Sequence, residues 1–113
     1  ILDMGCGNGI LSVVCATIWD AKVLAADISD KAVADTRQMA ETNNLSDVIT
    51  VIRSDGVNNQ LIKNNSPYDL ICFNLLAEPI IQSAHLIRDL LAPDGICIIS
   101  GILRWESEAV INT

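Results

Sequence analysis

Hydrophobic residues along this chain follow two alternating patterns. The pair Ile1-Leu2 is typical of the end of a strand, and four short aliphatic, β-branched runs predict further strands at residues 22–27, 48–53, 68–74 and 95–100. Because these runs are nearly continuous in apolar residues, we expect the strands to be buried on both faces of a sheet.

The segments between the predicted strands show the spacing of amphipathic helices. This spacing predicts three helices and a further helical pattern near the end of the chain, at residues 10–19, 30–43, 79–91 and 103–113. Ser29 can cap the second helix, and Pro79 suits the first turn of the third. The polar stretch NNQLIKNNSP predicts a long loop between the third and fourth strands, at residues 58–67.

Strands that alternate with helices predict an α/β fold with a mainly parallel sheet and helices on both faces. Right-handed crossovers would give a Rossmann-like, three-layer α/β/α arrangement with strand order 3-2-1-4-5, in which the first strand is central. The central strand begins at residue 1 and the chain stops within a helical pattern. We therefore expect residues 1–113 to be one domain that is truncated at both ends.

Composition narrows the possible classes of function. With 113 residues and 50% apolar content, the chain can build one globular core. Each apolar run is interrupted before the ~18 residues that a membrane span needs, and no basic segment precedes the first run, so neither a membrane span nor a signal peptide is expected. A net charge of −7 argues against a nucleic-acid partner and is compatible with a basic protein substrate.

The four cysteines stand singly among apolar neighbours, and the sequence contains one histidine, His85. Without a C-x-x-C pair or a second histidine, no metal site is expected. Isolated cysteines with apolar neighbours are typical of buried free thiols in a reducing compartment. We therefore expect a cytoplasmic protein.

The glycine-rich stretch DMGCGNG follows the first strand, where ligands bind in a doubly wound sheet. A dinucleotide fingerprint that begins at Gly5 and Gly7 needs its third glycine at position 10, which is Ile10. The pattern is instead D-x-G-x-G-x-G, from Asp3 to Gly9. A carboxylate at the rim of the pocket repels a pyrophosphate but attracts an ammonium or sulfonium group, which favours S-adenosylmethionine over NAD.

Two further acids lie at predicted strand ends. Asp27 ends the second strand, where Rossmann-like folds place a carboxylate on the ribose hydroxyls, and Ile28 would cover one face of the adenine. Asp55 is positioned to accept a hydrogen bond from the adenine amino group, and Gly56 would let the backbone approach the ring. Solvated strand-end caps are the alternative for both acids, but together with the glycine loop they favour a ligand site.

Several of these motifs resemble those of a known enzyme family. ILDMGCGNGIL, the acid of AADIS and the strand YDLICFN resemble the class I S-adenosylmethionine-dependent methyltransferases. NLLAEPI (74–80) and SGIL (100–103) resemble motifs of the PrmA family, which methylates the large-subunit ribosomal protein L11. The resemblance spans essentially all 113 residues and implies an S-adenosylmethionine-dependent methyltransferase.

The resemblance also implies contacts with the cofactor. Asp3 and the backbone of the loop glycines would hold the methionine moiety, and Asp27 would hold the ribose. Cys6 lies within the loop and is counted with these positions, although we assign its thiol no chemistry. The complete set of expected cofactor-binding residues is Asp3, Gly5, Cys6, Gly7, Gly9, Asp27, Ile28, Asp55, Gly56 and Asn74.

Asn74 and the carbonyl of Leu75 would line the catalytic slot where the methyl group meets its acceptor amine. Methyl transfer is an in-line displacement at an activated carbon, so the enzyme mainly aligns the lone pair of a neutral amine. An amide oxygen and a backbone carbonyl can accept the N–H bonds of that amine and so aim the lone pair. A turn residue at a strand end is the alternative for Asn74.

Members of the family methylate lysine side chains and N-terminal amines, so the implied partner is a basic ribosomal protein. A methyltransferase for RNA or a small molecule is an alternative, although the chain lacks the N-P-P-Y motif whose aromatic residue stacks a flipped base. A non-catalytic cofactor-binding fragment is another, because the family recognises its substrate through a separate N-terminal domain that these residues lack. The sequence leaves the oligomeric state open.

Overall fold

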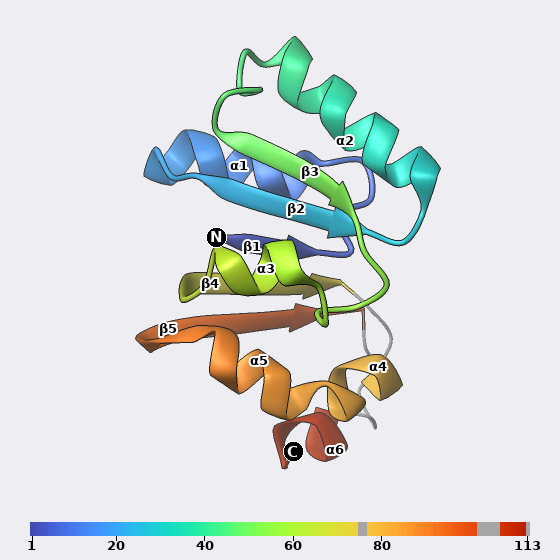
Figure 1. The fold of residues 1–113 in the computed structure, drawn as a ribbon, viewed down its shortest axis with the longest axis vertical. Coiled ribbons are helices and arrows are strands. Elements are labelled where there is room, and N and C mark those ends of the chain that lie inside the picture. The colour runs from blue at the N-terminus through green and yellow to red at the C-terminus, as the bar shows by residue number, and fades with distance from the viewer. Residues whose placement is uncertain (75–76, 102–106, 113) are drawn as a thin grey trace.

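A parallel sheet of five strands runs through the computed structural model, which describes residues 1–74, 77–101 and 107–112 (Figure 1). The strands are β1 (Leu2–Met4), β2 (Val23–Asp27), β3 (Ile49–Arg53), β4 (Tyr68–Asn74) and β5 (Leu91–Ser100). The helices of this part of the chain are α1 (Ile10–Trp19), α2 (Asp30–Thr42), α3 (Gln60–Asn64), α4 (Ala77–Gln82), α5 (Ala84–Leu90) and α6 (Ser107–Ile111).

The central strand is β1, which lies between β2 and β4 in the order β3-β2-β1-β4-β5. Leu2 pairs with Leu24 of β2 and with Ile71 of β4. Each pair of neighbouring strands is parallel, so the carboxyl ends of all five strands lie at one edge of the sheet. The order predicted from the sequence is confirmed, and the loops after β1 to β4 meet at this carboxyl edge.

Two hydrophobic clusters cover the two faces of the sheet. Alternate residues of β2 divide between them, with Leu24 and Ala26 in one cluster and Val23 and Ala25 in the other. Helices α3, α4 and α5 complete the first cluster through Ile62, Ile80, Ile87 and Leu90. Helices α1 and α2 complete the second through Cys15, Ala16, Val33 and Ala40, which confirms the three-layer α/β/α arrangement.

Burial differs between the central and the edge strands. All of β1 is buried, and β2 is buried up to Asp27. The expectation of burial on both faces is wrong for β3 and for β5, which contain exposed residues among their buried or half-buried ones. Ile96 and Ile98 of β5 are 61% and 52% exposed. Both strands lie at the edges of the sheet, where a layer of helices covers less of the face.

The predicted loop at residues 58–67 contains the short helix α3. Asn59 caps this helix by accepting a hydrogen bond from the Leu61 amide at 2.9 Å, and Ile62 is fully buried against the sheet. The signal in the sequence was an Asn cap before the apolar pair Leu61-Ile62. The surrounding asparagines hid that signal, because they favour a turn.

The predicted helix at residues 79–91 is divided. Helix α4 ends at Gln82, Ser83 leaves the helical conformation at φ −100° and ψ 5°, and α5 follows. Leu91 already belongs to β5, which pairs with β4 through an irregularity that separates the partners of Tyr68 and Leu70. The pattern of apolar residues continues across the break, so periodicity alone could not reveal it.

Membrane crossing requires a long, apolar helix. Within residues 1–74, 77–101 and 107–112, every helix falls short of the length and hydropathy that this needs.

Candidate functional site

The residues predicted to bind a ligand lie at the carboxyl edge of the sheet. The glycine loop follows β1, Asp27 ends β2, Asp55 and Gly56 follow β3, and Asn74 ends β4. Since β2 and β4 flank β1, Asp27 and Asn74 lie on opposite sides of the glycine loop. This is the position at which open α/β sheets bind their ligands. Leu75, the other predicted catalytic residue, lies outside the described residues.

Gly5, Gly7 and Gly9 all have positive φ, at 77°, 56° and 88°. A Cβ atom added to Gly9 would lie 2.9 Å from the Thr36 Cα of helix α2, so a larger residue does not fit there. A Cβ atom added to Gly7 would meet no atom within 4 Å, because this side of Gly7 faces open space. The loop is therefore packed against α2 on one side and accessible on the other.

The Asp3 carboxylate lies beneath the loop, not at the rim of the pocket where the sequence analysis expected it. Asp3 is only 2% exposed, and its Oδ2 accepts a hydrogen bond from the Ser12 hydroxyl of α1 at 2.5 Å. Burial raises the pKa of this carboxyl, the nearby charge of Asp27 raises it further, and the Ser12 hydrogen bond acts in the opposite direction. An ionised Asp3 would place negative charge under the loop, in a poorly solvated position.

Asp27 connects the glycine loop to the end of β2. Its Oδ2 accepts a hydrogen bond from the Gly7 amide at 3.1 Å, and its Oδ1 accepts one from the Ser29 amide at 3.0 Å. Asp27 is half-buried. A carboxylate has about four acceptor positions, so each oxygen of Asp27 retains the capacity for another hydrogen bond.

The end of β3 is held beside the end of β2. The Ser54 amide donates to the Asp27 carbonyl at 3.0 Å, and the Ser54 hydroxyl donates to the Gly56 carbonyl at 2.6 Å. Ile28 is 53% exposed, and Asp55 is exposed next to Gly56. Exposed apolar and acidic side chains therefore stand together at this part of the carboxyl edge.

Asn74 is exposed at the end of β4 and pairs with Ser100 of β5. The Ser100 hydroxyl lies 3.3 Å from the Phe73 carbonyl and 3.5 Å from Asn74 Oδ1. The structure thus brings together the first residues of the NLLAEPI and SGIL motifs. Residues 102 and 103 of the second motif lie outside the described part of the chain.

Ser12, Thr36 and Ser100 contact the predicted site residues, and the sequence analysis did not select them. Ser12 and Thr36 are 0% and 1% exposed. Both are short polar residues on the buried sides of helices, at positions that otherwise hold apolar residues. A hydroxyl group at such a position is the signal that could have pointed to them.

The thiol of Cys6 lies within the loop and is 7% exposed. Burial raises its pKa to about 11, so the thiol is neutral near pH 7 and is a poor nucleophile. All four cysteines are free. Within the part of the chain that the structure describes, no group of three His, Cys, Asp or Glu residues is arranged to hold a metal ion.

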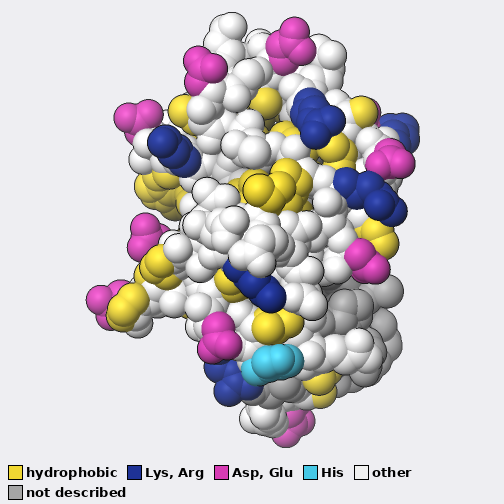
Figure 2. Space-filling view, in the orientation of Figure 1, with side chains coloured by type: hydrophobic (Ala, Val, Ile, Leu, Met, Phe, Trp, Pro, Cys, Tyr) yellow, Lys and Arg dark blue, Asp and Glu magenta, His cyan; other side chains and the backbone are white. Residues whose placement is uncertain are grey.

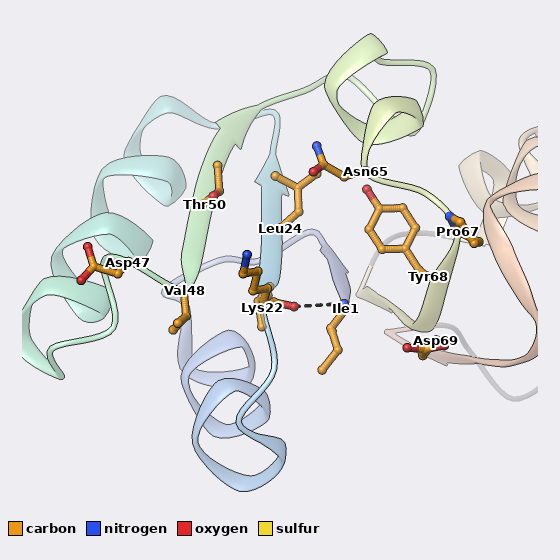
Figure 3. Close-up of a pocket in the computed structure, with 11 residues that line it drawn as sticks. Ile1, Lys22, Leu24, Asp47, Val48, Thr50, Asn65, Pro67, Tyr68 and Asp69 are labelled. Atoms are coloured by element: carbon orange, nitrogen blue, oxygen red, sulfur yellow. Dashed lines mark hydrogen bonds between the residues drawn. The ribbon is translucent and has the colours of Figure 1, made fainter.

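A cavity of about 390 Å³ lies at the opposite edge of the sheet, near the amino ends of the strands (Figure 3). Lys22, Asp47 and Tyr68 line it, and the Ile1 amine donates a hydrogen bond to the Lys22 carbonyl at 3.1 Å. Its lining includes none of the predicted site residues. We therefore place the candidate site at the carboxyl edge and not in this cavity.

Charged side chains of both signs are interspersed on the face shown in Figure 2. This face offers no continuous basic surface for a phosphate backbone.

Comparison with known proteins assigns the chain to a family. The model of the ribosomal protein L11 methyltransferase (PrmA) family matches residues 1–113. The ribosomal protein L11 methyltransferase of Brucella suis is 36% identical over 110 residues, which are 97% of this chain and 39% of that relative. The chain thus spans well under half the length of this relative.

Two solved structures extend the comparison. The crystal structure of the ribosomal protein L11 methylase from Lactobacillus delbrueckii subsp. bulgaricus has a TM-score of 0.86 at 27% identity, over 98% of this chain and 55% of that one. The Trypanosoma brucei PRMT1 enzyme-prozyme complex with AdoHcy has a TM-score of 0.66 at 28% identity, over 85% of this chain and 31% of that one. Because the family model matches the whole chain, a relative is 36% identical over 97% of it and the folds agree, the chain belongs to the ribosomal protein L11 methyltransferase (PrmA) family.

Proposed function

We propose that these residues form the cofactor-binding and catalytic core of an S-adenosylmethionine-dependent methyltransferase that modifies protein amino groups. The proposed acceptors are lysine side chains or the N-terminal amine of a large-subunit ribosomal protein, which places the reaction in the cytoplasm. One observation carries the proposal: Asp27 and Asn74, at the ends of the two strands that flank β1, lie on either side of an accessible glycine loop.

The residues of the carboxyl edge fit the parts of S-adenosylmethionine. The open side of Gly7 allows close approach to the methionine moiety, and Asp27 retains acceptor capacity for the two ribose hydroxyls. Exposed Ile28 offers an apolar surface to one face of the adenine, while Asp55 offers an acceptor to its amino group. When bound, the cofactor would supply a methyl group that its cationic sulfur activates.

Charge at the site is consistent with a cationic cofactor. Asp27 lies beside the loop and Asp3 is buried under it, so a sulfonium or ammonium group above the loop would lie near the Asp27 carboxylate, with the loop between it and Asp3. A bound cation would favour the ionised form of Asp3 against the burial that raises its pKa. A pyrophosphate in the same place would meet repulsion from both groups.

Asn74 is proposed to orient the acceptor amine. Its amide oxygen can accept an N–H bond of a neutral amine and direct the lone pair toward the methyl carbon, and the Leu75 carbonyl is proposed to accept a second. Neither group acts as a strong base, so the amine must arrive deprotonated. For lysine at pH 7 this costs about 4 to 5 kcal/mol, which desolvation in the slot can reduce.

The net charge of the chain and the residues after Asn74 favour a protein acceptor over a nucleic acid. The net charge of −7 attracts a basic protein and repels a phosphate backbone. Residues 75–77, which follow Asn74, are Leu-Leu-Ala, and they contain no aromatic ring on which a flipped base could stack.

Transfer of labelled methyl groups tests the proposed function. Purified protein is incubated with labelled S-adenosylmethionine and with unmethylated large ribosomal subunits, and the protein and RNA fractions are then separated. We expect the label in a ribosomal protein, at an amino group. Asn74→Ala should lower kcat about 100-fold, since it removes an aligning group but leaves the cofactor loop in place. Label in ribosomal RNA alone would reject the protein acceptor.

A further inference from the structure

Thr36 of α2 is a polar residue in an apolar environment. It is 1% exposed and lies on the same side of α2 as Val33 and Ala40, which pack against the sheet. Its hydroxyl lies 3.0 Å from the Gly7 carbonyl and 3.2 Å from Cys6 Sγ. The side chain of a helix residue thus reaches the centre of the glycine loop, 29 residues earlier in the chain.

Gly7 is held from two sides. Its amide donates to the Asp27 carboxylate at 3.1 Å, and its carbonyl accepts from the Thr36 hydroxyl at 3.0 Å. Because Gly7 is at positive φ and faces open space on one side, packing alone does little to fix its orientation. The two hydrogen bonds therefore set how Gly7 faces the proposed cofactor.

Thr36 also limits how far the loop can move. Its Cα and Cγ2 atoms lie 2.9 Å from the position that a Cβ atom on Gly9 would occupy. The Gly9 backbone thus rests directly against Thr36, which prevents the loop from moving toward α2. The hydroxyl and the methyl group of one side chain therefore constrain two different residues of the loop.

We propose that Thr36 is a positioning residue for cofactor binding, which orients the backbone of Gly7 and through it the Asp27 carboxylate, the proposed ribose contact. The inference rests on the proposed function. If the Thr36 hydroxyl is removed, the Gly7 carbonyl loses its partner, and the φ and ψ angles of Gly7 are less constrained. A shift of the Gly7 backbone moves its amide relative to Asp27, whose carboxylate then loses one of the two hydrogen bonds that orient it.

Four variants at two positions separate positioning from structural support. Thr36→Val preserves the shape of the side chain and removes the hydroxyl, whereas Thr36→Ser preserves the hydroxyl and removes the methyl group. Thr36→Ala removes both, so its comparison with Thr36→Ser isolates the hydroxyl if the valine variant folds poorly. Thr42→Val is the matched control, because Thr42 is exposed at the last residue of the same helix.

The dissociation constant of S-adenosylhomocysteine is measured by calorimetric titration of purified, folded protein, alongside the midpoint of urea unfolding. We expect Thr36→Val to raise the dissociation constant roughly five- to tenfold, with Thr36→Ser and Thr42→Val within about twofold of wild type. Thr36→Ser should nevertheless be destabilised by the lost methyl group. If the role of Thr36 were purely structural, the affinity for S-adenosylhomocysteine would instead decrease in proportion to the loss of stability across the variants.

The two proposals fail in different ways. If folded wild-type protein does not bind S-adenosylhomocysteine, the proposed function is contradicted. If wild type binds and Thr36→Val binds equally well, or if Thr36→Ser and Thr36→Ala weaken binding to the same extent, the proposed role of Thr36 is overturned and the cofactor site stands.

Discussion

Each carboxylate oxygen of Asp27 already serves the protein, and we propose that each also serves the ribose. The Gly7 and Ser29 amides occupy one acceptor position on Oδ2 and on Oδ1. These two hydrogen bonds fix the plane of the carboxylate before any ligand binds. Two roles that the sequence analysis treated as alternatives, a strand-end cap and a ribose contact, are compatible in this geometry.

Removing the Asp27 carboxylate tests this double role. Asp27→Ala should raise the dissociation constant of S-adenosylhomocysteine by about 10- to 100-fold, because hydrogen bonds to a charged group are lost. Asp30→Ala is a suitable control, since the Asp30 side chain is 91% exposed and lies three residues away. Calorimetric titration of both variants measures the effect. Equal affinity of the Asp27 and Asp30 variants would contradict a ribose contact by Asp27.

Asp3 makes a prediction about pH. Its pKa is raised in the folded protein above the ordinary value of 3.8, chiefly by burial, so folding favours the protonated form. The native state then binds more protons than the unfolded state between the two pKa values, and the contribution of Asp3 to stability falls as pH rises through that window.

Asp3→Asn provides the comparison, because an amide does not titrate and can still accept from Ser12. The free energy of unfolding of wild type, minus that of Asp3→Asn, should decrease as pH rises above about 3.8 and become constant beyond the raised pKa. Urea unfolding over a series of pH values measures this difference. An increase with pH would show that the fold favours the ionised form of Asp3.

Among the elements of the fold, α2 packs closely against the glycine loop, and this packing helps to determine the shape of the candidate site. The two elements approach so closely that Gly9 is in contact with the backbone of Thr36, whereas Gly7 faces open space. The loop is also bound to the end of β2, since the Gly5 and Cys6 amides both donate to the Ala26 carbonyl at 2.8 and 3.1 Å. Helix and strand together therefore define the conformation of the loop.

Alanine substitution of Gly7 and of Gly9 separates the effect of steric contact with α2 from the effect of backbone strain. Both residues have positive φ, so alanine at either position is strained by about 1 to 2 kcal/mol. Gly9→Ala also forces a Cβ atom against Thr36, whereas Gly7→Ala does not. The free energy of unfolding of Gly9→Ala should therefore be lower than that of Gly7→Ala by about 1 kcal/mol or more, as for a substitution that overpacks a core. Urea unfolding compares the two variants. Equal destabilisation would contradict the close contact between Gly9 and α2.

The order of the elements was predictable from the sequence, because strands and helices of ordinary length alternate and crossovers are right-handed. The break at Ser83 and the short helix α3 were not. Ser83 lies within a continuous apolar pattern, which hides the break. The Asn59 cap of α3 was hidden among asparagines that favour a turn, and α3 is also stabilised by the buried contact of Ile62 with the sheet.

The common position of the candidate site residues at the strand ends was predictable for a similar reason. Parallel strands bring their carboxyl ends to one edge, so Asp27, Asp55 and Asn74 could be assigned to one site from the sequence. The burial of the Asp3 carboxylate and the contact of Thr36 with the loop depend on how α1 and α2 pack. Such contacts join residues far apart in the chain, and the spacing of motifs does not encode them.

At the scale of the whole molecule, the candidate site and one of the cavities lie at opposite edges of the sheet. The carboxyl edge carries the glycine loop and the predicted site residues, whereas the amino edge carries the cavity of about 390 Å³ that includes Lys22, Asp47 and Tyr68. Binding of the cofactor at the carboxyl edge is the central claim. Family membership supports that claim. The two regions are lined by different residues, so one residue-resolved experiment can distinguish them.

Amide chemical-shift mapping provides that experiment. Isotope-labelled protein is titrated with S-adenosylhomocysteine, and the shift of each backbone amide is followed by NMR. We predict that the largest changes occur at residues 5–9, at residues 27–29 and at residues 55–56, with small changes around Lys22, Asp47 and Tyr68. Absence of binding, or changes concentrated at the amino-edge residues, would contradict the cofactor site.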